Sequence, residues 1–311
     1  MNENTKSIIK ELLSLTQFTI YPLIELYGYF VFIGLFCLQN ESTNGVLLVL
    51  LFILYHIILT NKMVYFMQLY IKDGSTTLEL FPHADKLSDE IGYENVNPFV
   101  KQNILERNIQ KSQFCEICNT FKPPRCHHCS KCNRCLLKFD HHCHMFDTCI
   151  GFHNYKFFIQ FLNFNLFGSI VFLITIGLAL GLGVAEQRGI FVNFIIAIVF
   201  YSIEFVVSLM FFSFHIKLLS RNETTIEYFA LNAYLKGDHS YIHVFQEGPT
   251  RNFIESTDRA VLNPYNLGTK ENFKEVFGDD FFSWISPTFT SKGNGVKFKL
   301  NEFEDIQKEE I

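Results

Sequence analysis

The sequence has few charged residues and no excess of basic ones. Its 311 residues include 26 Lys and Arg against 31 Asp and Glu, which gives a net charge of −5 and a pI of about 6.1. This balance disfavours a protein that binds nucleic acid mainly by electrostatic attraction, so we expect no nucleic-acid partner.

Cysteine is nearly absent outside one short segment. Eight of the nine cysteines lie between Cys115 and Cys149, and the ninth is Cys37. Small secreted modules spread their cysteines along the chain to form disulfides, so this distribution excludes that class. Apolar residues, in contrast, are abundant: 49% of the chain is hydrophobic and 36 residues are Phe, which excludes a disordered protein.

The apolar residues lie in four runs that are long enough to cross a bilayer, for which about 20 residues suffice. The runs extend from Phe18 to Leu38, from Val46 to Lys62, from Phe157 to Ala185 and from Gly189 to Phe214. Buried helices of a soluble protein are the alternative. We expect four membrane spans and, because the first ten residues are polar, no cleavable signal peptide.

Two features of the runs have competing interpretations. Glu204 interrupts the fourth run, and a carboxylate within a span is either functional or bonded to a neighbouring helix. Gly168 and Ser169 are small residues of the third run. They either border a deep cavity for a long chain or allow close packing of helices.

The basic residues predict which side of the membrane each loop faces. The segment from Asn61 to Lys156 contains twelve Lys and Arg, whereas the loop from Gln39 to Gly45 contains none. Basic loops stay in the cytosol, so we expect this segment and both termini to be cytosolic. The cysteines would then lie in a reducing compartment, where dense thiols usually bind metal or catalyse reactions.

The spacing of the cysteines predicts zinc. Two cysteines two residues apart can hold one side of a tetrahedral zinc site, as in Cys115 and Cys118. Spacing alone leaves the ligand sets open, because the pairs Cys126/Cys129 and Cys132/Cys135 have the same interval. Two sites of four ligands each would leave some thiols unused.

Residues Cys115 to Phe158 resemble the DHHC cysteine-rich domain of protein S-acyltransferases (palmitoyltransferases). The matching motifs are the CxxC pair, Lys122-Pro-Pro-Arg125, His128-Cys-x-x-Cys-x-x-Cys135, Asp140-His-His-Cys143, Cys149-Ile-Gly and Asn154-x-x-x-Phe158. Two further segments resemble the TTxE motif and the C-terminal motif of that family, at Thr224–Glu227 and at 263–278.

The resemblance implies a mainly α, four-helix polytopic membrane protein with a small, irregular zinc-binding domain of β-hairpins on the cytosolic side. The implied organisation is a cytosolic N-terminus (1–17), two spans (18–70), a cytosolic segment (71–156) with the cysteine-rich domain (115–158), two spans (157–217) and a cytosolic C-terminal region (218–311). In that last region we expect Asn272 to make buried hydrogen bonds. We expect Phe273, Val276 and Phe277 to pack on the zinc domain or the membrane.

The same resemblance assigns the ligands of two structural zinc ions. The first would be held by Cys115, Cys118, His128 and Cys135, and the second by Cys129, Cys132, His142 and Cys149. This leaves Cys126, interpreted as a packed thiol or else as an acylated or redox-active one, and Cys143, interpreted as the nucleophile. His141 would act as general base, and Asp140 would orient its ring.

The implied activity is transfer of a long acyl chain, such as palmitate, from acyl-CoA to protein cysteines. The acyl group would pass through a thioester on Cys143, and CoA phosphates would contact Lys122, Arg125 and His127 unless these three are surface or supporting residues. The expected partners are membrane-associated proteins with cytosolic cysteines and the bilayer itself. The expected location is the endomembrane system (ER or Golgi) or the plasma membrane.

The sequence departs from the family directly after the nucleophile. The family continues with Pro-Trp, whereas this chain has His144-Met145. We expect Met145 to fill much of the volume of the missing Trp and His144 to be an exposed polar residue or an extra acid or base. The alternatives to an active enzyme are a catalytically impaired paralogue and a membrane-anchored zinc-binding adaptor.

Overall fold

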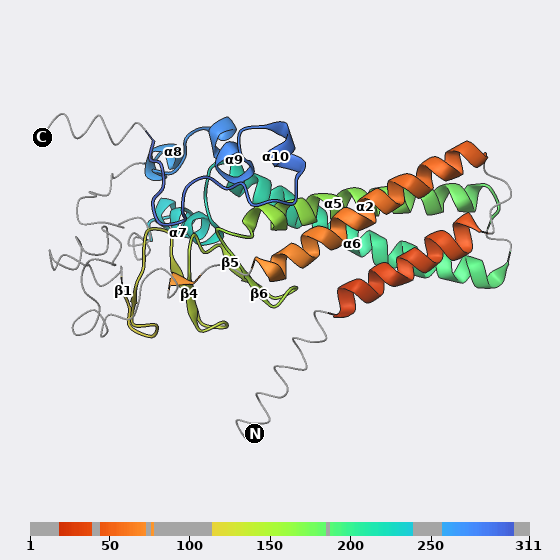
Figure 1. The fold of residues 1–311 in the computed structure, drawn as a ribbon, viewed down its shortest axis with the longest axis horizontal. Coiled ribbons are helices and arrows are strands. Elements are labelled where there is room, and N and C mark those ends of the chain that lie inside the picture. The colour runs from red at the N-terminus through yellow and green to blue at the C-terminus, as the bar shows by residue number, and fades with distance from the viewer. Residues whose placement is uncertain are drawn as a thin grey trace, which may run out of the picture. The chain divides into compact units, whose positions relative to one another are not determined.

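The computed structural model describes residues 19–38, 44–72, 76–77, 114–184, 187–238 and 257–301 (Figure 1). The predicted N-terminal segment 1–17, most of the segment between 71 and 113 and the last ten residues lie outside this part. The described part is mainly helical with short antiparallel strand pairs, which confirms the predicted fold class. It forms two compact units, one built on the long helices and one on the cysteine-rich segment and the region after residue 215.

The helical unit is built on four helices that are long and apolar enough to cross a membrane, as the four runs predicted. They are Thr19–Cys37, α2 (Gly45–Ile71), α5 (Tyr155–Gly181) and α6 (Arg188–Ser220). A bilayer offers no water to backbone groups, so such runs form helices, whose backbone bonds are internal. The first helix ends in a π-helical stretch, η1 (Phe30–Cys37).

Aromatic rings pack the interior of this unit. Phe172 stacks on Tyr201 with ring centroids 3.7 Å apart, and Phe32 stacks on Tyr55 at 4.1 Å. Gly28 makes this packing feasible, because a Cβ atom there would lie 1.9 Å from the hydroxyl oxygen of Tyr201. The first helix, α2, α5 and α6 therefore share one aromatic core.

A buried ion cluster also joins three of these helices. Lys62 on α2 donates to Glu25 on the first helix (2.5 Å) and to Glu204 on α6 (2.9 Å). The ammonium is neutralised inside the protein, so α2 continues as a helix past Lys62 to Ile71. Glu204 thus bonds to a neighbouring helix, which was the structural alternative for this residue.

Gly168 packs against the same cluster. A Cβ atom at this position would lie 2.9 Å from Ile58 Cγ2 and 3.4 Å from Lys62 Cδ. Ser169 is fully buried and donates to Leu166 O. The small residue at 168 therefore allows α2 and α5 to approach closely, as the packing interpretation expected.

The second unit contains three short β-hairpins followed by four helices. The hairpins are β1–β2 (Phe114–Cys115, Thr120–Phe121), β3–β4 (His127–Cys129, Arg134–Leu136) and β5–β6 (His141–Cys143, Thr148–Ile150). The helices are α7 (Thr225–Leu235), α8 (Arg259–Leu262), α9 (Thr269–Phe277) and α10 (Phe281–Ile285).

The three hairpins repeat one local pattern every 14 residues. Each connecting turn ends on a residue in the left-handed region, with φ of 48° at Asn119, 52° at Asn133 and 47° at Asp147. Asn and Asp adopt this conformation more readily than other non-glycine residues. A cysteine stands four residues before each of them, at Cys115, Cys129 and Cys143 in turn. The cysteine-rich segment thus contains three copies of the same hairpin turn, 14 residues apart.

The helices after residue 260 are fastened by amides and aromatic rings. Asn272 is fully buried, and its side chain donates to Ser220 O at the end of α6 and accepts from Leu267 N, which confirms the expected structural hydrogen bonds. Phe273 and Phe277 stack on Trp284 of α10 at 5.9 and 5.4 Å. The two rings are therefore in contact with an aromatic residue of the same region, and Val276 lines a pocket together with Lys138 and Asp140 of the cysteine-rich segment. Contact of this stripe with the membrane stays a prediction.

Removing Lys62, the cation of the ion cluster, should destabilise the folded protein strongly. Replacing Lys62 with Met leaves Glu25 and Glu204 buried without a counter-charge, which costs about 3–5 kcal/mol when a partner is removed from a buried ion pair. We expect a lower unfolding temperature and a lower folded yield in detergent. The triple variant Lys62→Met, Glu25→Gln, Glu204→Gln is the matched control and should recover most of the loss. An unchanged unfolding temperature for the single variant would show that the cluster contributes no stability.

Candidate active site and metal-binding groups

Two groups of three cysteines and one histidine come together on the hairpins. Within each group, the potential ligand atoms all lie within 4.8 Å of one another. The first group is Cys115, Cys118, His128 and Cys135, and the second is Cys129, Cys132, His142 and Cys149. The structure thus brings together the same two sets of four that the family resemblance implied. The sets interleave because the turn of one hairpin faces the strands of the next.

The geometry of both groups fits a tetrahedral zinc ion. Zn–S bonds near 2.3 Å and Zn–N bonds near 2.0 Å place sulfur and nitrogen about 3.6 Å apart. His128 Nδ1 lies 3.2, 3.6 and 3.9 Å from its three sulfur atoms, and His142 Nδ1 lies 3.4, 3.6 and 3.8 Å from its own three. With four protein ligands each, the groups have the closed shell that is typical of structural zinc.

Two cysteines of the described cysteine-rich segment belong to neither group. Cys126 is 2% exposed and packs with the cysteines of the first group, which fits the interpretation of a packed thiol. Cys143 is at the position of the 14-residue repeat that Cys115 and Cys129 occupy. Phe146 takes the place of the second cysteine in its turn, so the third turn lacks a metal-binding pair and Cys143 belongs to neither metal group.

Asp140, directly before β5, and His141, the first residue of β5, form a hydrogen-bonded pair. His141 Nδ1 lies 2.7 Å from Asp140 Oδ2, and the Asp140 carboxylate also accepts bonds from Thr225 Oγ1 (2.7 Å) and Thr225 N (2.9 Å). Asp140 is 2% exposed. Three donors hold this buried carboxylate, and it in turn fixes the imidazole ring.

The electrostatics of the pair favour a charged carboxylate and a protonated imidazole. Burial raises the pKa of Asp140, but the bonds from His141 and Thr225 and the nearby histidines outweigh it and lower the pKa to about 2. Burial likewise lowers the pKa of His141, whereas its hydrogen bonds to Asp140 and Cys143 raise it to about 10. The arrangement suits a histidine that holds a proton taken from the Cys143 thiol.

The TTxE-like segment provides the two hydrogen bonds from Thr225 to Asp140, which we call the clamp on Asp140. Thr224 caps α7: its hydroxyl accepts from Glu227 N, and Glu227 Oε2 accepts from Thr224 N. The Glu227 carboxylate also accepts two bonds from Arg125, each 2.7 Å long. One helix start thus orients Thr225 toward Asp140 and fastens α7 to the cysteine-rich segment. The sequence pattern identified this motif but not the residues that it contacts.

Of the two roles expected for Arg125, the structure favours support over contact with a phosphate. Its guanidinium is 1% exposed, donates to Glu227 and Asn222, and lies over the ring of Tyr265 at 4.3 Å. A buried guanidinium with these partners is engaged inside the protein and is not offered to a CoA phosphate. Lys122 and His127, the other two predicted phosphate contacts, are half-buried.

Sequence reasoning missed His215 and Tyr155, which lie beside the catalytic pair. His215 is 2% exposed, its ring centroid lies 5.5 Å from that of His141, and its Nδ1 lies 3.4 Å from the hydroxyl of Tyr155. His215 groups with Asp140 and His141 within 4.8 Å. A single histidine at the end of an apolar run carries no sequence signal, and only its place in the fold identifies it.

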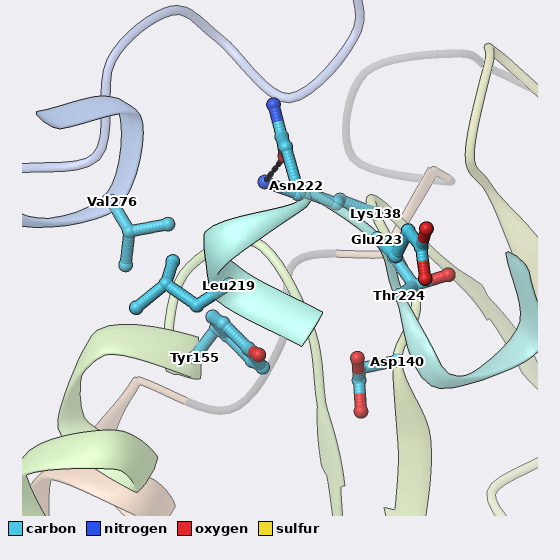
Figure 2. Close-up of a pocket in the computed structure, with 8 residues that line it drawn as sticks. All are labelled: Lys138, Asp140, Tyr155, Leu219, Asn222, Glu223, Thr224 and Val276. Atoms are coloured by element: carbon cyan, nitrogen blue, oxygen red, sulfur yellow. Dashed lines mark hydrogen bonds between the residues drawn. The ribbon is translucent and has the colours of Figure 1, made fainter. Parts of the chain in front are cut away.

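A small pocket lies behind Asp140 (Figure 2). Tyr155, Leu219 and Val276 form its apolar side, and the Asp140 carboxylate faces it from the opposite side. Lys138 also lines it, donating to Asn222 Oδ1 at 3.2 Å. Burial and the charge of Arg125 lower the pKa of Lys138 to about 7. The pocket has room only for water, so it supports Asp140 and does not receive a substrate.

The turn after Cys143 also differs from expectation. Met145 is 43% exposed, so it does not fill the volume of the missing Trp. Residues 144–147 belong to the helical unit, within which Phe146 is 1% exposed and packs on Phe66, Phe158 and Phe161 at 5.1 to 6.4 Å. His144 is exposed, as one interpretation expected. An aromatic ring is present after the nucleophile, but one position later than the family places it.

Comparison with known proteins agrees with this site. The family model for the DHHC palmitoyltransferase domain matches residues 108–232. Palmitoyltransferase ZDHHC15 of Homo sapiens is 31% identical over 96% of this chain and 86% of its own length, and that of Xenopus laevis is 30% identical over 94% and 83%. Palmitoyltransferase ZDHHC2 of Danio rerio is 31% identical over 89% and 74%. With this similarity along nearly its whole length, the chain belongs to the DHHC palmitoyltransferase family.

Proposed function

We propose that this membrane protein is a protein S-palmitoyltransferase that carries the acyl group on Cys143. The observation that supports this most directly is the Asp140–His141 pair, clamped by Thr225 and hydrogen-bonded to a cysteine that belongs to neither metal group. An adaptor that used its zinc groups only for binding would need neither the clamp nor a cysteine left without metal.

In the first step, the Cys143 thiol gives its proton to His141, and the thiolate attacks the carbonyl carbon of an acyl-CoA thioester. The C–S bond to CoA breaks, and the CoA thiolate leaves with a proton that His141 returns. Asp140 keeps the His141 ring oriented and balances its positive charge. The products of this step are the acyl-Cys143 thioester and free CoA.

In the second step, a cysteine of a protein substrate attacks the acyl-Cys143 thioester. His141 takes the proton of the incoming thiol, the substrate thioester forms, and Cys143 leaves as a thiolate that is protonated again. Zinc, when bound by the two Cys₃His groups, supplies structural support for the hairpins that carry Asp140, His141 and Cys143.

We propose the remaining assignments on physical grounds. The cysteine-rich domain and both termini face the cytosol, because basic residues concentrate on that side. The acyl chain is costly to hold in water, at about 0.8 kcal/mol per CH₂, so the membrane spans are its natural surroundings. Substrates are then membrane-associated proteins with cytosolic cysteines, and the enzyme resides in the ER, the Golgi or the plasma membrane. Lys122 and His127 contact the CoA phosphates.

Replacing Cys143 with Ser tests the nucleophile. We expect complete loss of hydroxylamine-sensitive labelling by radioactive palmitoyl-CoA, with about two zinc ions retained per chain by metal analysis, since Cys143 is outside both metal groups. Cys37→Ser is the matched control and should label normally. If the Cys143 variant still forms a hydroxylamine-sensitive thioester, another cysteine carries the acyl group. If it loses zinc, the division of the cysteines is wrong.

Replacing Thr225 with Val tests the clamp. The change keeps the volume and the backbone donor but removes the hydroxyl bond to Asp140, and a bond to a charged group contributes about 1.5–3 kcal/mol. We expect the initial rate of Cys143 acylation to fall about tenfold or more and the unfolding temperature to fall slightly, while the zinc content stays unchanged. Thr225→Ser, which retains the hydroxyl, should restore the rate. Equal rates for Val and wild type would remove Thr225 from the mechanism.

Lys122 and Arg125 should respond differently to substitution, although they belong to one motif. We expect Lys122→Gln to raise the KM for palmitoyl-CoA severalfold without changing the unfolding temperature. Arg125→Lys should lower the unfolding temperature, because a single ammonium cannot reproduce the two-bond contact with Glu227. A KM effect confined to the Arg125 variant would reverse these assignments.

A further inference from the structure

Helix α10 exposes an unusual amount of apolar surface. Phe281 is 72% exposed, Phe282 77% and Ile285 52%, and Trp284 between them is 37% exposed. We name these four residues the α10 patch. Concentrated exposure of this kind on a folded element usually marks a contact surface.

The α10 patch is built on a well-fastened support. Trp284 stacks on Phe273 and Phe277 of the adjacent α9 (Figure 1), and its indole N–H donates to Gly278 O at 2.9 Å. Asp280 caps α10 by accepting from Ser283 N at 2.8 Å. The patch is therefore held in one orientation and is not a frayed end of the chain.

A buried lysine ties the α10 region to the start of a membrane span. Lys156 is fully buried, and its ammonium donates to Ser283 O (2.6 Å), Thr288 O (2.8 Å) and Thr290 Oγ1 (2.9 Å). Lys156 is the second residue of α5, and the uncharged run of that span begins at the next residue, Phe157. The backbone of α10 is thus bonded to the first turn of the candidate span α5.

We propose that the α10 patch inserts into the headgroup region of the bilayer, on the side where α5 begins. Trp and other aromatic side chains favour this depth, where an apolar ring and a polar atom can both be accommodated. The residues that precede α10 are acidic, Asp279 and Asp280. Insertion is therefore driven by apolar contact, as for an interfacial helix, and not by attraction to anionic lipid.

This membrane contact has a function beyond anchoring, which four spans already provide. α9 lies beneath the patch, and Asn272 of α9 holds the end of α6 through Ser220 O. The segment that follows that end, Asn222 to Glu227, carries the clamp on Asp140 and Arg125. Insertion of the α10 patch into the membrane would thus restrict the motion of the helices that support Asp140 and His141.

The test uses Trp284, the only Trp of the chain, as its own depth probe. The full-length protein is placed in phosphatidylcholine nanodiscs whose lipids carry bromine either near the ester end or near the methyl end of the acyl chains. We expect the ester-end bromine to quench about half of the fluorescence, and the methyl-end bromine or aqueous iodide to quench much less. Adding anionic lipid should change little.

Three results would overturn the proposal. Strong quenching by iodide without quenching by lipid would place the patch in water. Protection from all quenchers would mean that protein covers it, either another segment or a second copy of the chain. Stronger quenching by the methyl-end bromine would place it deep in the hydrocarbon.

A pair of variants separates insertion from mere proximity. Phe281→Ser with Phe282→Ser removes the two most exposed rings, and we expect it to lose most of the lipid quenching while zinc content and Trp emission in detergent stay unchanged. Phe229→Ser removes a ring of similar exposure, 61%, from α7 and should leave the quenching intact. Equal quenching in the double variant and the wild type would show that the rings do not enter the bilayer.

Discussion

The buried ion pair between Arg125 and Glu227 connects two parts of the chain that are far apart in sequence. Arg125 lies in the cysteine-rich segment, and Glu227 lies on the helix that follows the fourth span. Both partners are almost fully buried, so loss of either one would leave an unpaired charge away from water. Because Glu227 also belongs to the N-terminal cap of α7, the same contact brings Thr225 to Asp140 and, through Asp140, orients His141.

The metal groups and the nucleophile follow from one repeated turn. The first two turns each contribute a pair of cysteines two residues apart, and each pair is completed by a histidine and a cysteine from the following hairpin. The third turn has Cys143 but Phe146 in place of a second cysteine, and no fourth hairpin follows among the described residues. The described hairpins thus group thiols for metal twice and leave the third thiol, Cys143, outside both groups, because its turn lacks a second cysteine and a following hairpin.

Much of this organisation could be predicted from the sequence. Apolar runs of sufficient length predicted the four long helices, because a bilayer permits only internally bonded backbone. The spacing of the cysteines predicted zinc, and family resemblance supplied the interleaved sets and the role of Cys143. The 14-residue repeat was also readable from the sequence, through Asn119, Asn133 and Asp147. It would have indicated the interleaving without reference to any family.

Other features were decided by the tertiary structure alone. The motif that contains Arg125 left open a phosphate contact or a supporting role, and the fold encloses the guanidinium between Glu227 and Asn222. Met145 was expected to replace a Trp, yet Phe146 is the ring that packs inside, and His215 carried no signal at all. Local pattern determines the helices and turns because those depend on residues close in sequence. Which side chain meets which, and whether water reaches it, depends on segments about 100 residues apart, and the distance between Arg125 and Glu227 along the chain is of that order.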